Sequence, residues 1–215
     1  MNYAELATAI EDTTENTFTD AQIKLFVQQA EQAIQNAVDL PTQRKTTTAT
    51  TSDGNAFFTL PSDYRYTYNV TSQINNIMTV LLHKDDSFIT EAFPSTLSSN
   101  RGAPVFYSNH SETSLKFGPT PDTAYQITLT YGGYPTSIAG DDKTATTTSY
   151  LGDNFDSTLL NGALVEAARF MKADPDIVAM YDKMYQTSMQ LLKNVGDGKL
   201  RGDAYRNGLP KTEVL

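Results

Sequence analysis

The sequence predicts an α+β protein in which an α-helical bundle is interrupted by an inserted antiparallel β domain. Apolar residues recur every three or four positions before residue 41 and again after residue 151, which is the period of an amphipathic helix. Between these stretches the period changes to two, and threonine and aromatic residues become frequent, as is typical of strands. We therefore expect a bundle domain from 1–41 and 151–195, a β domain at 42–150 and an extended C-terminal tail at 196–215.

The strongest helical signal is a pair of helices between Asn154 and Asn194. Their connection is very short, with Asp174 suited to the N-cap and Pro175 to the first helical position. So short a connection predicts two adjacent antiparallel helices, whose apolar stripes need a third helix to form a core. The stripes are Leu160, Ala163, Leu164, Ala167 and Met171 in the first helix, and Ile177, Met180, Tyr181, Met184 and Leu191 in the second.

The N-terminal part of the chain supplies the long N-terminal helix that this pair requires. Residues 3–12 predict a short helix, and a longer one follows at 19–38. Thr19 and Gln22 have the spacing of a capping box, which marks the start of that longer helix. Pro41 ends it, because proline disfavours the α region for the preceding residue.

The middle of the chain has the composition and the period of strands. A threonine run at 46–51 favours extended backbone, and a turn at 118–122 separates two of the later strands. The last strand has the clearest alternation of apolar and polar residues. The expected strands are 56–60, 65–70, 74–82, 106–107, 114–117 and 124–131, with polar loops at 95–103 and 138–149.

Composition and charge restrict the class of function. The chain has 215 residues, a formal net charge of −9 and no cysteine. A negative chain is a poor generic binder of DNA or of anionic membranes, and a chain without cysteine has neither disulfides nor thiolate zinc sites. The N-terminus lacks the pattern of a signal peptide, and we expect no membrane association.

The residues that could carry chemistry are few and scattered. His83 and His110 are the two histidines, and neither belongs to a catalytic or metal-binding motif. The pairs Asp85-Asp86 and Asp141-Asp142 lack the ligand spacing of a calcium loop, so we interpret them as solvated loop charges. We predict no catalytic residue, no metal site and no cofactor.

Three motifs follow one another along the chain. The first is Leu60-Pro61-Ser62-Asp63-Tyr64, and the second joins the segment from Gly102 to Tyr107 with Leu115 to Pro121 and the strand Tyr125–Tyr131. The third is Leu160 to Ala168 with Asp174 and Met180-Tyr181. In their order and spacing over about residues 15–195, these motifs resemble the head-to-tail adaptor (connector, or head completion) proteins of tailed bacteriophages.

The resemblance implies a structural protein of the virion neck that is assembled in the host cytoplasm. Such proteins form a ring, in this case expected to be a dodecamer, beneath the portal protein and above a tail or nozzle protein. DNA passes through the lumen without sequence-specific binding. The family supplies no catalytic residues to carry over to this chain.

A different class remains open as the alternative. The β domain could be the sandwich of a carbohydrate-binding module, with Tyr64, Tyr66, Tyr107 and Tyr134 as platforms on which sugars stack. The absence of tryptophan counts against this alternative, and it leaves the helical part of the chain without a role.

Two sets of residues are our candidates for contacts within the particle. The C-terminal tail is basic on an acidic chain and holds scattered apolar residues, so we expect it to contact the portal. The helical pair carries charges of both signs, which suits a contact between unlike faces of neighbouring ring subunits. The portal candidates are Leu200, Arg201, Tyr205, Arg206 and Leu209, and the ring candidates are Glu166, Arg169, Lys172, Asp182 and Lys183.

Overall fold

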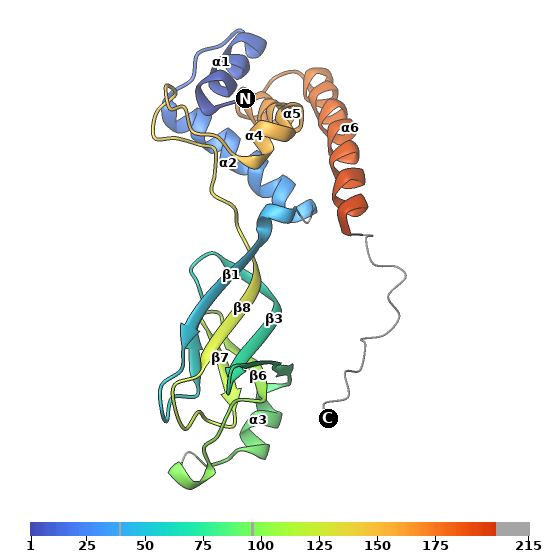
Figure 1. The fold of residues 1–215 in the computed structure, drawn as a ribbon. Coiled ribbons are helices and arrows are strands. Elements are labelled where there is room, and N and C mark those ends of the chain that lie inside the picture. Colours follow the sequence, from blue (N-terminus) through green and yellow to red (C-terminus); the bar gives the residue numbers. More distant parts are fainter. Residues whose placement is uncertain (39, 96, 201–215) are drawn as a thin grey trace. The chain divides into compact units, whose positions relative to one another are not determined.

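The computed structural model describes residues 1–38, 40–95 and 97–200, which form two compact units of an α+β protein (Figure 1). The first unit joins Met1–Pro41 to the chain from Thr136 onward, and the second is Thr42–Pro135. The predicted α+β class is confirmed. No helix within the described ranges has the length and apolar character needed to span a membrane.

The first unit is helical, and both of its N-terminal helices begin at side-chain caps. Helix α1 is Tyr3–Thr14 and α2 is Asp20–Ala37. Thr19 accepts a hydrogen bond from the backbone N–H of Gln22, whose side chain in turn accepts one from the N–H of Thr19, so the predicted capping box is present. The remaining helices are α4 (Tyr150–Asn154), α5 (Asp156–Phe170) and α6 (Pro175–Leu200).

The Thr19 cap gives the first testable expectation. Substitution Thr19→Ala removes the acceptor for the Gln22 N–H and should lower the free energy of unfolding by about 1 kcal/mol. Chemical denaturation followed by far-UV circular dichroism measures this loss. Thr19→Ser is the matched control, because it keeps the hydroxyl oxygen, and an equal loss in both variants would contradict the capping role.

Helix α5 is the centre of the helical unit, and α1, α2, α4 and α6 all pack against it. Its buried face includes Ala163 and Ala167, both fully buried, whose small side chains let neighbouring helices approach closely. The core is completed by apolar residues of α1 and α2 and by Leu192 of α6. The predicted α5 stripe therefore faces this core, with Leu160 and Met171 packed at its edge.

The predicted core face of α6 is wrong in most of its members. Tyr181 is buried as expected, but Ile177, Met180, Met184 and Leu191 are 42%, 50%, 47% and 65% exposed. The face that packs on α5 is instead formed by Val178, Tyr181, Tyr185, Met189 and Leu192. Helix α6 thus has two apolar faces, and a spacing of three and four cannot tell which of them is inward. The helix also runs to Leu200, so 196–200 are not part of an extended tail.

A loop that precedes α4 belongs to the helical unit. Ile138 is fully buried in the helical core, although the sequence predicts residues 136–150 in the β domain. Two contacts hold the loop to α2. The side chain of Glu31 accepts hydrogen bonds from the Ile138 backbone N–H, at 2.9 Å, and from the Ser137 hydroxyl. Burial raises the pKa of Glu31, against the opposing effect of these two hydrogen bonds.

The second unit is a pair of four-stranded sheets with a core between them. The first sheet has the order β1-β8-β3-β4 with all pairs antiparallel, and the second has the order β2-β7-β6-β5. Contrary to the expected antiparallel domain, β5 pairs with β6 in parallel. The strands are β1 (Arg44–Thr50), β2 (Phe57–Thr59), β3 (Tyr64–Ile74), β4 (Ile77–Val80), β5 (Leu82–His83), β6 (Phe106–Ser111), β7 (Ser114–Gly118) and β8 (Gln126–Gly133).

One helix of the second unit is not predicted by the sequence. Helix α3 (Asp86–Ala92) packs against β6 and β7 and buries Ile89. It begins at Asp85, whose carboxylate accepts hydrogen bonds from the backbone N–H and the hydroxyl of Ser87. Asp85 is exposed, in agreement with its interpretation as a solvated charge, but it caps a helix and does not lie in a loop.

Candidate functional site

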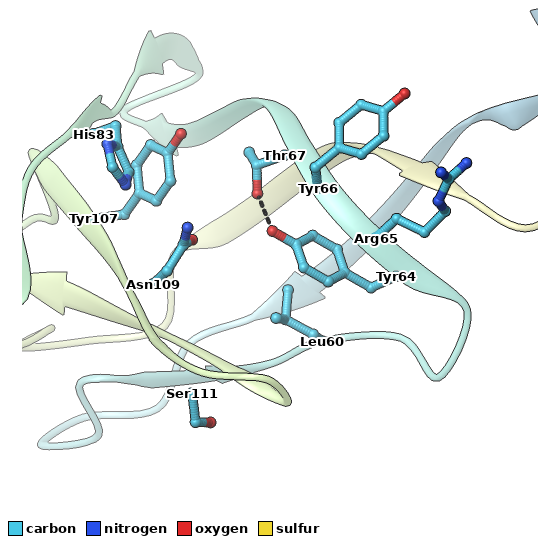
Figure 2. A pocket seen from close by; sticks show the side chains of 9 residues that line it. All are labelled: Leu60, Tyr64, Arg65, Tyr66, Thr67, His83, Tyr107, Asn109 and Ser111. Atoms are coloured by element: carbon cyan, nitrogen blue, oxygen red, sulfur yellow. Dashed lines mark hydrogen bonds between the residues drawn. The ribbon is translucent and has the colours of Figure 1, made fainter. Parts of the chain in front are cut away.

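The β unit has a pocket of about 350 Å³ between its two sheets (Figure 2). Its lining comes from Leu60 and the first residues of β3, from the end of β5 and from β6. The lining residues are Leu60, Tyr64, Arg65, Tyr66, Thr67, His83, Tyr107, Asn109 and Ser111.

Strand pairing leaves this part of the two sheets open. Strand β4 pairs only with Thr71–Ile74 of β3, and β5 pairs only with Phe106 and Tyr107 of β6. Among the described strands, none therefore pairs on that side with the first half of β3 or with the second half of β6. The pocket lies between these two uncovered stretches, so it depends on segments that are far apart in the chain.

Two groups of side chains face the pocket, as Figure 2 shows. The hydroxyls of Tyr64 and Thr67 lie 2.9 Å apart in a hydrogen bond, and the rings of His83 and Tyr107 are in edge contact with centroids 5.1 Å apart. Burial, with a smaller effect from Tyr64, raises the pKa of the Tyr107 hydroxyl, which favours its neutral form. The pocket thus offers aromatic surface together with neutral hydrogen-bonding groups.

The tyrosines proposed as sugar platforms are only partly brought together. Tyr64, Tyr66 and Tyr107 line the pocket, whereas Tyr134 stacks against Arg65, with the guanidinium 4.6 Å from its ring centre. The ring of Tyr66 covers Gly132 on the neighbouring strand β8, where an added Cβ would come within 2.5 Å of the ring. This ring therefore already has a structural partner. Asn109 and Ser111 also line the pocket, and no sequence motif points to them.

The two histidines lie in separate places. His83 lines the pocket, whereas His110 lies beside Phe57 and has its Nδ1 3.5 Å from a carboxylate oxygen of Asp86. Among the residues that the structure describes, no three histidine or acidic side chains gather in a way that could hold a metal ion. Neither histidine has a neighbouring nucleophile in a catalytic arrangement among the contacts of the described residues.

Asp86 is part of a polar cluster rather than a solvated loop charge. It accepts a hydrogen bond from Ser108 at 3.0 Å and lies 3.5 Å from the Lys116 ammonium as well as beside His110. Burial opposes the ionisation of Asp86, but Ser108, Lys116 and His110 together outweigh it and lower its pKa. The cluster ties α3 to β6 and β7. In the second acidic pair, Asp141 lies 3.2 Å from the Lys24 ammonium, and Asp142 caps a turn at Thr144.

The ring-contact candidates are distributed over α5, the connection that follows it and α6. Arg169 donates a hydrogen bond to Glu166 at 2.8 Å within α5, and Lys172 lies in the connection to α6 with a positive φ of 54°. Asp182 is half-buried on α6, and Lys183 is exposed. Lys183 also lines a shallow, mostly apolar pocket of about 360 Å³ between α5 and α6, beside Met184 and Leu191.

The portal-contact candidates lie at or beyond the end of the described residues. Leu200 is the last residue of α6, and its side chain lies outside the described part of the chain. Arg201, Tyr205, Arg206 and Leu209 lie wholly outside the described residues.

Comparison with known proteins adds a family match over nearly the whole chain. A family model described as SU10 adaptor protein matches residues 1–209, which include both units and most of the sequence after α6. No curated protein matches the chain.

Proposed function

Because the chain belongs to the SU10 adaptor protein family, a phage head-to-tail adaptor family, we propose that it forms a ring beneath the portal and joins the capsid to the tail. The observation that carries this proposal is the family match over residues 1–209. The ring is a dodecamer in the virion neck, assembled in the host cytoplasm, and its β unit faces the tail or nozzle protein. DNA passes through its lumen.

Two features of the chain support this proposal. The formal charge of −9 suits a channel wall, since a basic lumen would retain phosphates by counterion release. Helix α6 keeps an apolar face exposed in the single subunit, as expected for a chain that completes its packing in an assembly. The experiment is co-sedimentation of the chain with the purified portal, followed by native mass measurement. We expect a ring of fixed subunit number on the portal, and a chain that remains monomeric and unbound would overturn the proposal.

The charged candidates of the helical pair give a prediction on ring formation. Arg169→Glu breaks the bond to Glu166 and places two like charges one helical turn apart. We expect fewer subunits to associate on the portal, while helicity changes little because Arg169 is exposed and such exposed pairs contribute only about 0–1 kcal/mol. Arg169→Gln is the control that removes the charge without reversing it. Normal ring formation by the Arg169→Glu variant would show that the charged surface around Arg169 does not contact a neighbouring subunit.

The proposed adaptor has no catalytic residue. His83→Ala and His110→Ala should therefore leave particle assembly and infectivity nearly unchanged. Plaque counts on a host that supplies each variant in place of the original protein measure this. If particles of normal composition lost infectivity in either variant, a chemical role of the histidine would have to be reconsidered.

The pocket of the β unit favours one second candidate, a glycan-binding role within or beside the particle. Three of the four proposed platform tyrosines line it, together with neutral hydrogen-bonding groups. Glycan-array binding by the isolated chain, lost in Asn109→Ala at an exposed position of the pocket, is the expected result for this role. Equal signals from both proteins would exclude it.

A further inference from the structure

Helix α6 has an exposed apolar stripe formed by Ile177, Met180, Met184 and Leu191, here called the α6 outer stripe. Its members are separated by three, four and seven residues, so they lie on one side of the helix. A different side of α6 already packs on α5. The stripe extends over about 21 Å of helix at 1.5 Å per residue. A helix with a second apolar side needs a second partner, and the described residues of the single subunit leave this side exposed.

A second observation concerns α2. Its outward side, here called the α2 outer face, consists of Ala21, Leu25, Gln28, Gln29 and Gln32, all exposed. Leu25 is 46% exposed, and every member of this face is uncharged. Depletion of charge around an exposed leucine distinguishes the core of an interface from ordinary surface. With 18 residues, α2 is about 27 Å long, enough to cover the stripe.

The α6 outer stripe has a neighbouring pocket for an apolar side chain, and the α2 outer face has an exposed leucine that can fill it. The α6 outer stripe borders the shallow pocket between α5 and α6, which is large enough for an aliphatic side chain. Lys183 lies at the edge of this pocket, and Gln32 lies two helical turns from Leu25 on the other surface. Leu25 of one copy can therefore enter the pocket of another while the Lys183 ammonium donates a hydrogen bond to the amide oxygen of Gln32. No like charges oppose one another in this arrangement, because the α2 outer face carries none.

We propose that the α6 outer stripe of one subunit packs on the α2 outer face of the next copy of this chain, with Leu25 seated in the α5–α6 pocket. The proposal rests on the ring described above and identifies the surfaces that close it. Each copy offers one of each surface, so the contact is head-to-tail and can propagate around a ring. A specific interface buries roughly 800 Å² per partner, more than four side chains supply, so polar neighbours such as Lys183 and Gln32 form its rim.

The absence of cysteine makes disulfide trapping a direct test. An untagged chain with Leu25→Cys is mixed with a tagged chain carrying Met184→Cys. The mixture is oxidised once in solution and once on the purified portal. The tag lets a mass measurement distinguish the heterodimer from the two homodimers. We expect a heterodimer as the main product, and little homodimer from either variant alone. A chain carrying both cysteines should give a ladder of higher oligomers. Gln186→Cys, at an exposed α6 position off the stripe, replaces Met184→Cys in the matched control.

Specificity is tested by adding Met180→Asp to the Met184→Cys chain, which should reduce the heterodimer to the level of the Gln186→Cys control. Circular dichroism checks that each variant keeps its helices. The proposal is overturned if the yield of heterodimer does not exceed that of the Gln186→Cys control, either in solution or on the portal. It is also overturned if the Met184→Cys chain alone forms homodimers as readily as the mixture forms heterodimers, since that would indicate a symmetric α6–α6 contact. Portal co-sedimentation of the unsubstituted chain distinguishes failure of the proposed contact from failure of the proposed adaptor function. If the chain binds the portal but the cysteine variants do not cross-link, only the α6–α2 contact is refuted. If the variants cross-link but the chain does not bind the portal, only the adaptor function is refuted.

Discussion

Deletion of residues 201–215 is expected to weaken co-sedimentation with the purified portal by roughly tenfold or more, the effect of losing one or two energetically dominant interface residues. The deleted segment carries Arg201, Arg206 and Lys211 against Asp203 and Glu213, so it is basic on an acidic chain. Tyrosine and arginine are the residue types most often dominant at interfaces, which makes Tyr205 and Arg206 our named anchors.

The deletion should begin directly after the last residue of α6. The helix continues to Leu200, so a chain that stops at Asn194 would also lose part of its last helix. A chain that stops at Leu200 keeps α6 whole and should retain its helicity. The double substitution Tyr205→Ala with Arg206→Ala is the matched variant of full length. Undiminished portal binding by the shortened chain would show that the segment is not the docking element.

Glu31→Ala is expected to cost about 2–3 kcal/mol of stability, because it leaves the buried N–H of Ile138 without an acceptor. The Ser137 hydroxyl loses its acceptor as well, so the loop should detach from α2. Glu31→Gln keeps an acceptor oxygen for Ile138 and removes the charge. Urea denaturation of the three proteins, followed by circular dichroism, measures the difference. A loss in Glu31→Ala no larger than in Glu31→Gln would contradict this role.

The same carboxyl gives a dependence on pH with a definite sign. Burial raises the folded-state pKa of Glu31 above the ordinary 4.5. The folded protein then binds a proton more tightly than the unfolded chain. This contribution to stability is fully present below about pH 4.5 and is lost as the pH rises through the raised folded-state pKa. Glu31→Gln should remove that part of the pH dependence, and an unchanged profile would contradict the assignment to Glu31.

Local signals explain which parts of the fold can be predicted. The capping box at Thr19 and Gln22 marks the start of α2, because a cap acts over a few neighbouring residues. Helix α3 escapes prediction because Asp85 and Asp86 resemble loop charges, although an aspartate followed by Ser87 also suits a helix start. The inward side of α6 cannot be found from spacing, since two of its sides are apolar.

The pocket in the β unit is beyond sequence-based prediction for a different reason. It forms where β3 and β6, from two different sheets, extend past their short neighbours β4 and β5. Strand lengths and pairing partners are properties of the whole domain. Tyr64 and Tyr107 can be named individually as candidate aromatic platforms, but their position in one recess with Asn109 requires the fold.

The way in which the chain enters and leaves the β unit has a consequence for how such proteins can diversify. The insertion begins on β1 and ends on β8, and these two strands are paired, with Arg44 opposite Gly132. Lys45 reinforces this junction through Asp63 and the carbonyl oxygen of Tyr134. Because both ends meet, a single recombination cassette from 42 to 135 could be exchanged between related viruses while the helical unit stays intact. With the proposed orientation, in which the β unit faces the tail protein, such an exchange would give a phage a new tail-side partner while it keeps its own portal.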